Sequence, residues 1–194
     1  MQHPSCARAL GHVVLDVTSL ARSVPFYVQA FGLRVVGRTD EADRSRIGDI
    51  VFLSFGANHH DIGLREMPAF DRPAGAAHPS PRAGLAHVAF RLGDSIDDLE
   101  QLVRRLTRAG AQGVRAADHG ATLSVYFNDP DGLALEAYVG DDTLPDEPLS
   151  IVAMPLPIDV DTGALGHNAL SRWQVREGHS SGRGGTQVTK VVRD

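Results

Sequence analysis

The same order of secondary structure is predicted twice along the chain, and this repeat limits the fold more than any other feature. The strand patterns Gly11–Val17 (GHVVLDV) and Leu85–Leu92 (LAHVAFRL) each place one histidine among alternating apolar residues. These histidines, His12 and His87, lie 75 residues apart. Each strand is followed by the pattern of one helix and three more strands. The sequence therefore predicts an α+β fold of two tandem βαβββ modules, residues 9–67 and 84–140.

In the first module, Pro25 decides where the helix is expected to begin. Because proline is best tolerated in the first turn of a helix, a start near Ser23 is favoured, with Thr18 and Ser19 as alternative capping residues. Gly32 is the expected C-terminal stop. The three strands that follow are predicted at residues 34–38, 50–55 and 60–66.

The helix of the second module has a clearer signal, because apolar residues recur every three or four positions. Ser95 and Asp97 can cap its N-terminus, and Gly110 ends it. The turn Asp129–Gly132 (DPDG) separates the last two strands. The apolar stripe consists of Ile96, Leu99, Leu102, Val103 and Leu106. The strands are predicted at residues 113–117, 123–127 and 133–139.

The remaining segments lack a periodic pattern. Residues 1–8 are predicted to be a loose arm, and residues 68–83 a proline-rich linker in which His78 is solvated. Residues 141–164 are predicted to be an extended segment that packs along the surface or on a partner subunit. The basic, glycine-containing tail, residues 165–194, is predicted to be mostly disordered.

The composition excludes several classes of protein. With 42% hydrophobic and 22% charged residues, the 194-residue chain can bury a core. Its net charge of −5 disfavours nucleic acid and anionic membranes as partners, and no apolar run approaches the ~20 residues that span a bilayer. The N-terminus lacks the pattern of a secretory signal, and the single cysteine, Cys6, excludes an internal disulfide. We therefore expect a cytoplasmic protein.

The alternation of apolar residues assigns three metal-capable side chains to equivalent faces. In both lead strands the apolar residues face the helix, which leaves His12 and His87 on the opposite face. Glu136 is on the corresponding face of the last strand, because Leu135 and Ala137 beside it face the core. If both sheets curve round a shared cavity, two imidazoles and one carboxylate point into it. Such a set leaves coordination positions open and suits Fe(II), although Mn(II), Ni(II), Co(II) and Zn(II) can also use it.

Each of these residues alone has an ordinary structural explanation, since a strand histidine is usually hydrogen-bonded and a strand glutamate usually faces solvent. Their occurrence on equivalent faces of repeated modules favours a metal centre. The sequence has no G-x-G-x-x-G after a strand, no P-loop, no G-x-S-x-G nucleophile elbow and no cysteine cluster. The metal centre is therefore the main functional hypothesis.

Three segments resemble the ligand strands of the vicinal oxygen chelate superfamily, which includes glyoxalase I, fosfomycin-resistance proteins, bleomycin-binding proteins and extradiol ring-cleaving dioxygenases. They are GHVVLDV, LAHVAF and DPDGLALEAYV, and the resemblance covers about residues 9–140. It implies that His12, His87 and Glu136 are the metal ligands. It also implies that the two modules form a curved mixed sheet round a metal-containing cavity, as in the glyoxalase/dihydroxybiphenyl dioxygenase-like fold.

Further matches favour the type I extradiol, catechol 2,3-dioxygenase-like members. The segment Asn58–Leu64 (NHHDIGL) is similar to their N-H-H-D-[IL]-A-L segment, which implies that His60 is a catalytic acid/base beside the oxygen site. The turn Asp118–Gly120 is similar to their D-H-G turn, which implies that His119 is a second catalytic histidine. Tyr126 follows that histidine by seven residues and precedes the predicted glutamate ligand by ten, as the active-site tyrosine of the smaller members does.

The resemblance implies an Fe(II)-dependent enzyme that uses O2 to cleave a catechol-type aromatic diol, and it implies a homodimer. The modules of one chain can pair with each other, or His12 can meet His87 of a second chain. Glyoxalase-type isomerases and lyases usually need a fourth ligand, for which the nearest acids are Asp61 and Glu66; His60 could also be that ligand. The resemblance is also compatible with a thiol transferase and with a non-catalytic protein that binds a small molecule, such as an antibiotic.

Overall fold

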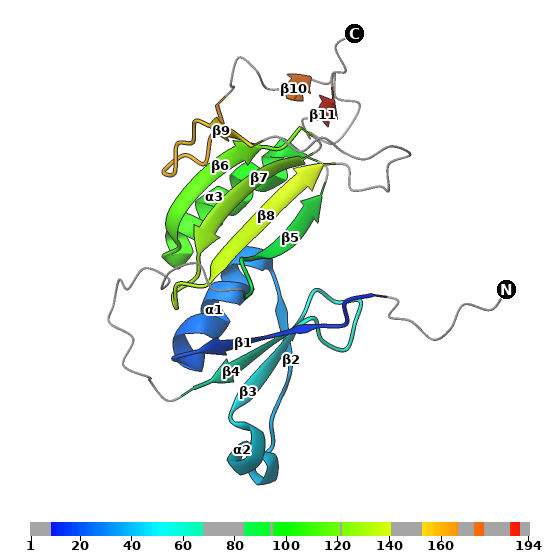
Figure 1. Cartoon of the computed structure of the whole chain (residues 1–194), viewed down its shortest axis with the longest axis vertical. Coiled ribbons are helices and arrows are strands. Elements are labelled where there is room, and N and C mark those ends of the chain that lie inside the picture. The colour runs from blue at the N-terminus through cyan, green and yellow to red at the C-terminus, as the bar shows by residue number, and fades with distance from the viewer. Residues whose placement is uncertain are drawn as a thin grey trace, which may run out of the picture. The chain divides into compact units, whose positions relative to one another are not determined.

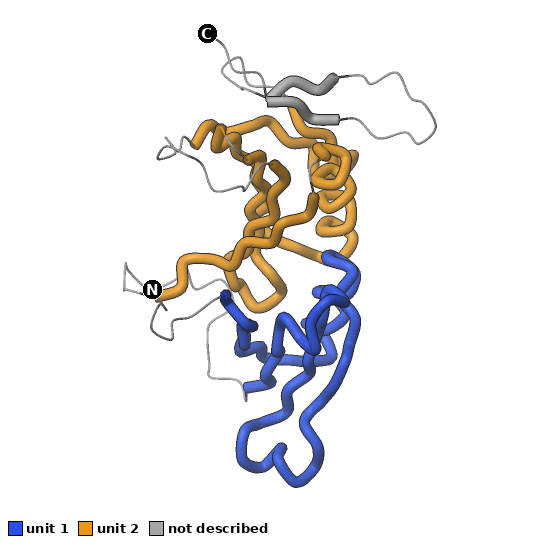
Figure 2. Tube along the Cα trace, turned by 90° about the vertical axis from the view of Figure 1, so that its right-hand side faces the viewer, with its two compact units in different colours: residues 1–80 blue, residues 81–194 orange. Residues whose placement is uncertain are grey.

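The chain divides into two structural units, residues 1–80 and 81–194 (Figure 2). The computed structural model describes residues 9–67, 84–93, 95–120, 122–140 and 153–166, together with strands at 173–176 and 187–190. The predicted N-terminal arm and the predicted linker, with Cys6 and His78, lie outside the described residues.

The first unit is a four-stranded sheet with one long helix against it (Figure 1). Its strand order is β1-β4-β3-β2, with β1 parallel to β4 and the other neighbours antiparallel. The elements are β1 (Val13–Val17), α1 (Leu20–Phe31), β2 (Arg34–Arg38), α2 (Glu41–Ile47), β3 (Ile50–Ser54) and β4 (Ile62–Glu66). Apolar side chains of α1 and the sheet form the core: Leu15, Val17, Phe26, Tyr27, Ala30, Val51, Leu53 and Leu64.

Helix α1 begins at Leu20, with Ser19 as its N-cap residue, so the predicted start near Ser23 was wrong. The Ser23 N–H already donates to the Ser19 carbonyl (2.9 Å) as part of the helix. Pro25 therefore lies in the second turn, where it removes one helical hydrogen bond. Burial of Leu20 before it and Phe26 after it offsets this loss.

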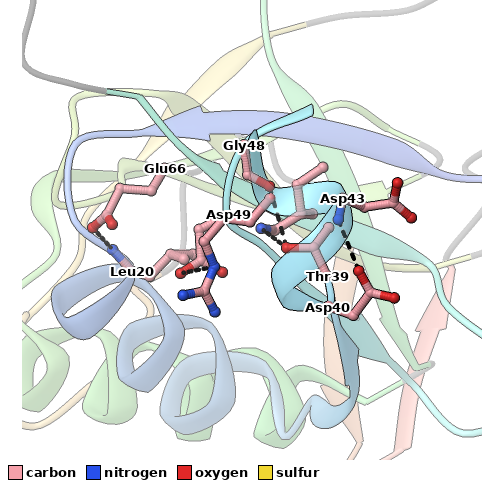
Figure 3. Close-up of polar contacts among 9 residues, drawn as sticks. Leu20, Thr39, Asp40, Asp43, Gly48, Asp49 and Glu66 are labelled. Atoms are coloured by element: carbon pink, nitrogen blue, oxygen red, sulfur yellow. Dashed lines mark hydrogen bonds and ion pairs between the residues drawn. The ribbon is translucent and has the colours of Figure 1, made fainter. Parts of the chain in front are cut away.

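Helix α2 was not predicted, because its sequence EADRSRI has no apolar stripe and none of its residues is buried. Local polar contacts hold it instead (Figure 3). The Asp40 carboxylate accepts a hydrogen bond from the Asp43 N–H (2.8 Å) at the N-terminus. At the base of the insertion, the Thr39 hydroxyl donates to the Gly48 carbonyl (3.2 Å) and accepts from the Ile50 N–H (3.1 Å). The two hydrogen bonds of Thr39 close the loop between β2 and β3.

The second unit repeats this arrangement with a five-stranded sheet (Figure 1). Its order is β5-β8-β7-β6-β9, with β5 parallel to β8 and the other neighbours antiparallel. All five predicted stripe residues of its helix are buried, Ser95 caps the N-terminus, and Gly110 is left-handed at the C-terminus. The elements are β5 (Val88–Gly93), α3 (Ile96–Ala109), β6 (Gln112–Asp118), β7 (Thr122–Asn128), β8 (Ala134–Gly140) and β9 (Met154–Leu156).

The described part of the extended C-terminal segment packs on the second unit. Strand β9 pairs with β6, and the loop after it lies on α3, where Arg104 Nη1 donates to the Thr162 carbonyl (3.0 Å) and Thr107 Oγ1 to the Val160 carbonyl (2.8 Å). In the tail predicted to be mostly disordered, β10 (Trp173–Arg176) and β11 (Gln187–Lys190) pair antiparallel.

Both units therefore share one topology, in which the first strand runs parallel to the last. The predicted α+β fold of two repeated modules is confirmed, with α2 as an addition to the first. Among the helices described, none has the length and apolar character needed to cross a membrane.

Candidate functional site

Two of the three predicted metal ligands, His87 and Glu136, meet in the second unit. The register of β5 and β8 places Ala89 opposite Glu136, so His87, one residue before β5, reaches the neighbouring carboxylate. His87 Nε2 lies 2.9 Å from Glu136 Oε2. The Glu136 side chain is 11% exposed and that of His87 is 40% exposed. Within the pair, the Glu136 carboxylate is therefore mostly buried, and the His87 imidazole is accessible to solvent.

This separation fits a shared metal ion. Two ligands at right angles, each about 2.1 Å from one metal, are about 3 Å apart. The imidazole and carboxylate also supply the donor types that divalent transition metals use. His12, the third predicted ligand, belongs to the first unit. Within the described residues, no group of three or more His, Cys, Asp or Glu side chains is assembled to hold a metal.

Tyr126 links this pair to a second histidine. Tyr126 is on β7 and stands opposite Glu136 on β8. Its ring meets the His87 ring edge-on, with 5.8 Å between the ring centroids. Its hydroxyl lies 2.7 Å from His119 Nε2. On its other side, the Arg115 guanidinium carbon lies 4.2 Å from the ring centroid. The structure therefore brings the predicted residues His87, His119, Tyr126 and Glu136 into one cluster.

The protonation state of Tyr126 follows from this environment. Burial, followed by the negative charge of Glu136, raises the pKa of Tyr126 to about 12, although the Arg115 cation acts in the opposite direction. The hydroxyl is therefore protonated at neutral pH and can donate one hydrogen bond. Tyr126 and His119 are in hydrogen-bond contact and each could take up a proton; this environment favours His119 as the base.

Two short turns hold these residues in register. In the predicted turn before β8, Asp129 Oδ1 accepts hydrogen bonds from the backbone N–H groups of Asp131 (2.9 Å) and Leu133 (2.8 Å). In the turn after β6, Asp118 Oδ1 accepts from the Gly120 N–H (2.7 Å), where glycine has a φ of 82°. The first turn sets the register of the strand that carries the glutamate, and the second orients the intervening histidine.

The first unit holds the other two predicted site residues, His12 and His60. His12 lies one residue before β1, as His87 does before β5. The His60 ring centroid is 4.5 Å from that of His12 and 4.9 Å from that of Phe52. His60 Nδ1 also lies 2.6 Å from His59 Nδ1. Partial burial, then the charges of the neighbouring His59 and His12, lower the pKa of His60 below its ordinary value.

The acids that could have been a fourth ligand have structural contacts instead. The Asp61 carboxylate accepts hydrogen bonds from the Asn58 side chain (2.7 Å) and the Phe55 N–H (2.8 Å). Although burial acts to raise it, these bonds lower the pKa of Asp61. Glu66 accepts from the Leu20 N–H (2.9 Å) at the N-terminus of α1, as Figure 3 shows.

The pairing registers make a residue-by-residue comparison of the two sheets possible. In the second unit, one row across the sheet is Ala89, Glu136, Tyr126 and Arg115. In the first unit, the equivalent row is Val14, Gly63, Phe52 and Gly37. Gly63 thus occupies the position of Glu136, and the first unit has no acid there.

Sequence reasoning missed Arg115. The strand that carries Arg115 was predicted, and the alternation of side chains along a strand indicates which face of the sheet each residue is on. Its contact with Tyr126, however, depends on the register between β6 and β7, which shifts at an irregularity between Gln112 and Arg115. No sequence pattern reveals such a shift.

Comparison with known proteins agrees with the fold of two repeated modules. Residues 9–137 match the family described as the Glyoxalase/Bleomycin resistance protein/Dioxygenase superfamily. Biphenyl-2,3-diol 1,2-dioxygenase 3 of Rhodococcus globerulus is 31% identical over 141 residues, which are 71% of this chain and 66% of that protein. The chain therefore spans slightly less than two thirds of that dioxygenase.

Two further similarities are to a transferase and to a solved structure. The glutathione transferase FosA of Serratia marcescens is 28% identical over 134 residues, 69% of this chain and 82% of that protein. The crystal structure of a glyoxylase/bleomycin resistance protein/dioxygenase domain from Frankia sp. EAN1pec superposes with a TM-score of 0.55 at 25% identity, and covers 70% of this chain and all of that domain. Because the family match extends over more than half of its length, the chain belongs to the glyoxalase/bleomycin resistance protein/dioxygenase superfamily.

Proposed function

We propose that the chain is a metal-dependent extradiol-type dioxygenase, which cleaves the ring of a catechol-type aromatic diol with O2. The superfamily includes dioxygenases, lyases and transferases, so membership alone does not select the reaction. One observation carries the proposal: Tyr126 contacts both a metal-ligand pair, His87 and Glu136, and a potential base, His119. The similarity to a biphenyl-diol dioxygenase supports it.

We infer that His12, His87 and Glu136 hold the metal, with Fe(II) as the first expectation. His12 would come from the same chain or from a second copy in a homodimer. A divalent metal bound there would lower the pKa of the hydroxyl groups that chelate it, as it does for bound water. The 2.9 Å approach of His87 to Glu136 supports this ligand set.

The other residues of the proposed site would bind substrate and move protons. The Tyr126 hydroxyl would relay the proton that the diol releases: it would pass its own proton to His119 Nε2, 2.7 Å away, and take up the proton of the substrate. His60 would stabilise negative charge that develops on oxygen and then donate a proton to it. The product would be a ring-opened semialdehyde.

The glyoxalase-type alternative is weakened by the acids of the first unit. The Asp61 and Glu66 carboxylates already accept hydrogen bonds from backbone and side-chain donors. At the position equivalent to Glu136, the first unit has Gly63 and therefore no carboxylate. A metal-dependent thiol transferase is the second candidate, because the match to FosA extends over 82% of that protein.

Metal analysis of anaerobically purified protein, followed by assay of a panel of catechols, tests the proposal. We expect iron in the protein and a yellow ring-opened product from at least one catechol. Manganese, nickel or zinc in a protein that leaves every catechol intact would contradict the dioxygenase and favour the transferase or isomerase.

A further inference from the structure

Arg115 is a cation beside the proposed site that the proposed reaction leaves without a role. Its guanidinium lies 4.2 Å from the centroid of the Tyr126 ring, and its residue is exposed. In the part of the chain that the structure describes, no Asp or Glu forms an ion pair with it. By contrast, three other arginines form ion pairs with an aspartate: Arg44, Arg46 and Arg65.

The position of Arg115 relative to the ligand pair is set by the sheet. Arg115 on β6 stands opposite Tyr126 on β7, which stands opposite Glu136 on β8. Residues opposite one another in antiparallel strands point to the same face. The strand of Arg115 is two strand spacings, about 10 Å, from that of Glu136, and its side chain reaches back over the tyrosine ring between them.

We propose that Arg115 binds a carboxylate substituent of the substrate, so that the site prefers anionic ring diols. This inference rests on the proposed function. A planar guanidinium can form two parallel hydrogen bonds with a carboxylate, which gives both affinity and orientation. A diol held at the His87–Glu136 end and directed across Tyr126 would bring a substituent on its far side to the guanidinium. Arg115 would then be a specificity-determining residue.

Equilibrium binding under anaerobic conditions tests the inference with the whole 194-residue chain and the metal that it retains through purification. The probes are 3,4-dihydroxybenzoate and its methyl ester, which differ in charge but share the diol. We expect the wild-type protein to bind the acid more tightly than the ester by tenfold to a hundredfold, on the order expected for charge-assisted hydrogen bonds. Arg115→Met, which keeps an unbranched side chain, should remove this preference, and Arg115→Lys should restore part of it.

The outcomes separate this inference from the proposed reaction. If catechols are not cleaved but the acid is still preferred in an Arg115-dependent manner, the reaction is wrong and the inference stands. Equal affinity of the wild-type protein for acid and ester would overturn the inference, even if catechol is cleaved. An equal loss of affinity for both probes in Arg115→Met would also overturn it, because Arg115 would then only support Tyr126. Binding of neither probe to the wild-type protein contradicts the inference as well.

Discussion

The two units have the same strand order and the same parallel pairing of first and last strands, yet their equivalent rows differ in chemistry. Each unit places a histidine one residue before its first strand. Across the sheet, the second unit then has Glu136, Tyr126 and Arg115, where the first has Gly63, Phe52 and Gly37. In this row, one copy of the repeat therefore carries an acid, a tyrosine and an arginine, and the other carries apolar or small residues.

This difference indicates a division of roles between the copies. The second unit provides two predicted ligands in contact, at 2.9 Å, and a tyrosine beside them that is protonated at neutral pH. The first unit provides one predicted ligand and His60, which has no counterpart among the polar residues of the second unit because Leu133 occupies the equivalent position. Substitutions that make one unit resemble the other are therefore the most informative tests.

The largest effect is expected from removing a predicted metal ligand of the second unit. His87→Ala should weaken metal affinity by a hundredfold or more and abolish ring cleavage, because Glu136 loses its neighbouring ligand. Metal content after anaerobic dialysis measures this. His119→Ala is the matched control, since His119 is hydrogen-bonded to the Tyr126 hydroxyl (2.7 Å) and is not a predicted ligand, and it should retain the metal. Equal metal content in the two variants would remove His87 from the ligand set.

His60 tests the special role of the first unit. His60→Ala should leave metal content and substrate affinity unchanged but lower kcat by about 100-fold or more, as for the loss of a general acid/base. Single-turnover kinetics and substrate binding measure the two parts, with His59→Ala as the neighbouring control that is expected to lose less. A variant that no longer binds substrate would assign His60 to substrate binding.

Gly63→Glu tests whether the missing acid matters. A Cβ at this position would approach Val14 Cγ2 to 3.3 Å, and Val14 is 44% exposed and can yield. The added carboxylate should occupy a coordination position that the diol or O2 needs, so ring cleavage should fall about tenfold while metal is retained. Gly63→Gln is the control for side-chain size. Equal losses in both variants would show that crowding, and not a new ligand, is responsible.

Tyr126→Phe makes the second unit match Phe52 of the first and should change the response to alkali. With the Tyr126 pKa raised to about 12, its stabilising effect is complete below the unfolded-state value, about 10, and is lost as pH rises through the folded value. Urea unfolding of the wild-type protein at a series of pH values should therefore show stability falling between those limits. The stability of the phenylalanine variant should fall less steeply, and its phenolate absorbance change at alkaline pH should be smaller by the contribution of one of the three tyrosines.

The smallest effect concerns the two equivalent helix starts. Ser95 Oγ accepts a hydrogen bond from the Asp97 N–H (3.2 Å), whereas the Ser19 side chain makes no capping bond and Glu66 serves the Leu20 N–H instead. Ser95→Ala should lower the free energy of unfolding by about 1 kcal/mol, and Ser19→Ala by only a few tenths. Urea denaturation of both variants measures this difference. A larger loss for Ser19→Ala would contradict the assignment of its cap to Glu66.

The sequence predicted the structure best where apolar residues that become buried recur at the regular spacing of a helix or a strand. All five stripe residues of α3 are buried, and alternation assigned Leu135 and Ala137 to the core beside Glu136. It failed where local contacts or distant packing decide. Helix α2 depends on polar bonds near Asp40, and α1 includes Pro25 because its apolar face is buried. The approach of His87 to Glu136 follows from a parallel pairing that no local pattern specifies.

The parallel pairing of first and last strands also has a consequence for folding. His87 and Glu136 are 49 residues apart in the chain, and their contact forms only when the unit is closed by its most distant strand pair. Closing such a loop has an entropic cost that must be met before the contact stabilises anything. A metal that binds both residues would bind the closed form selectively and would oppose its opening by mass action. Metal affinity would then report on the integrity of the whole second unit.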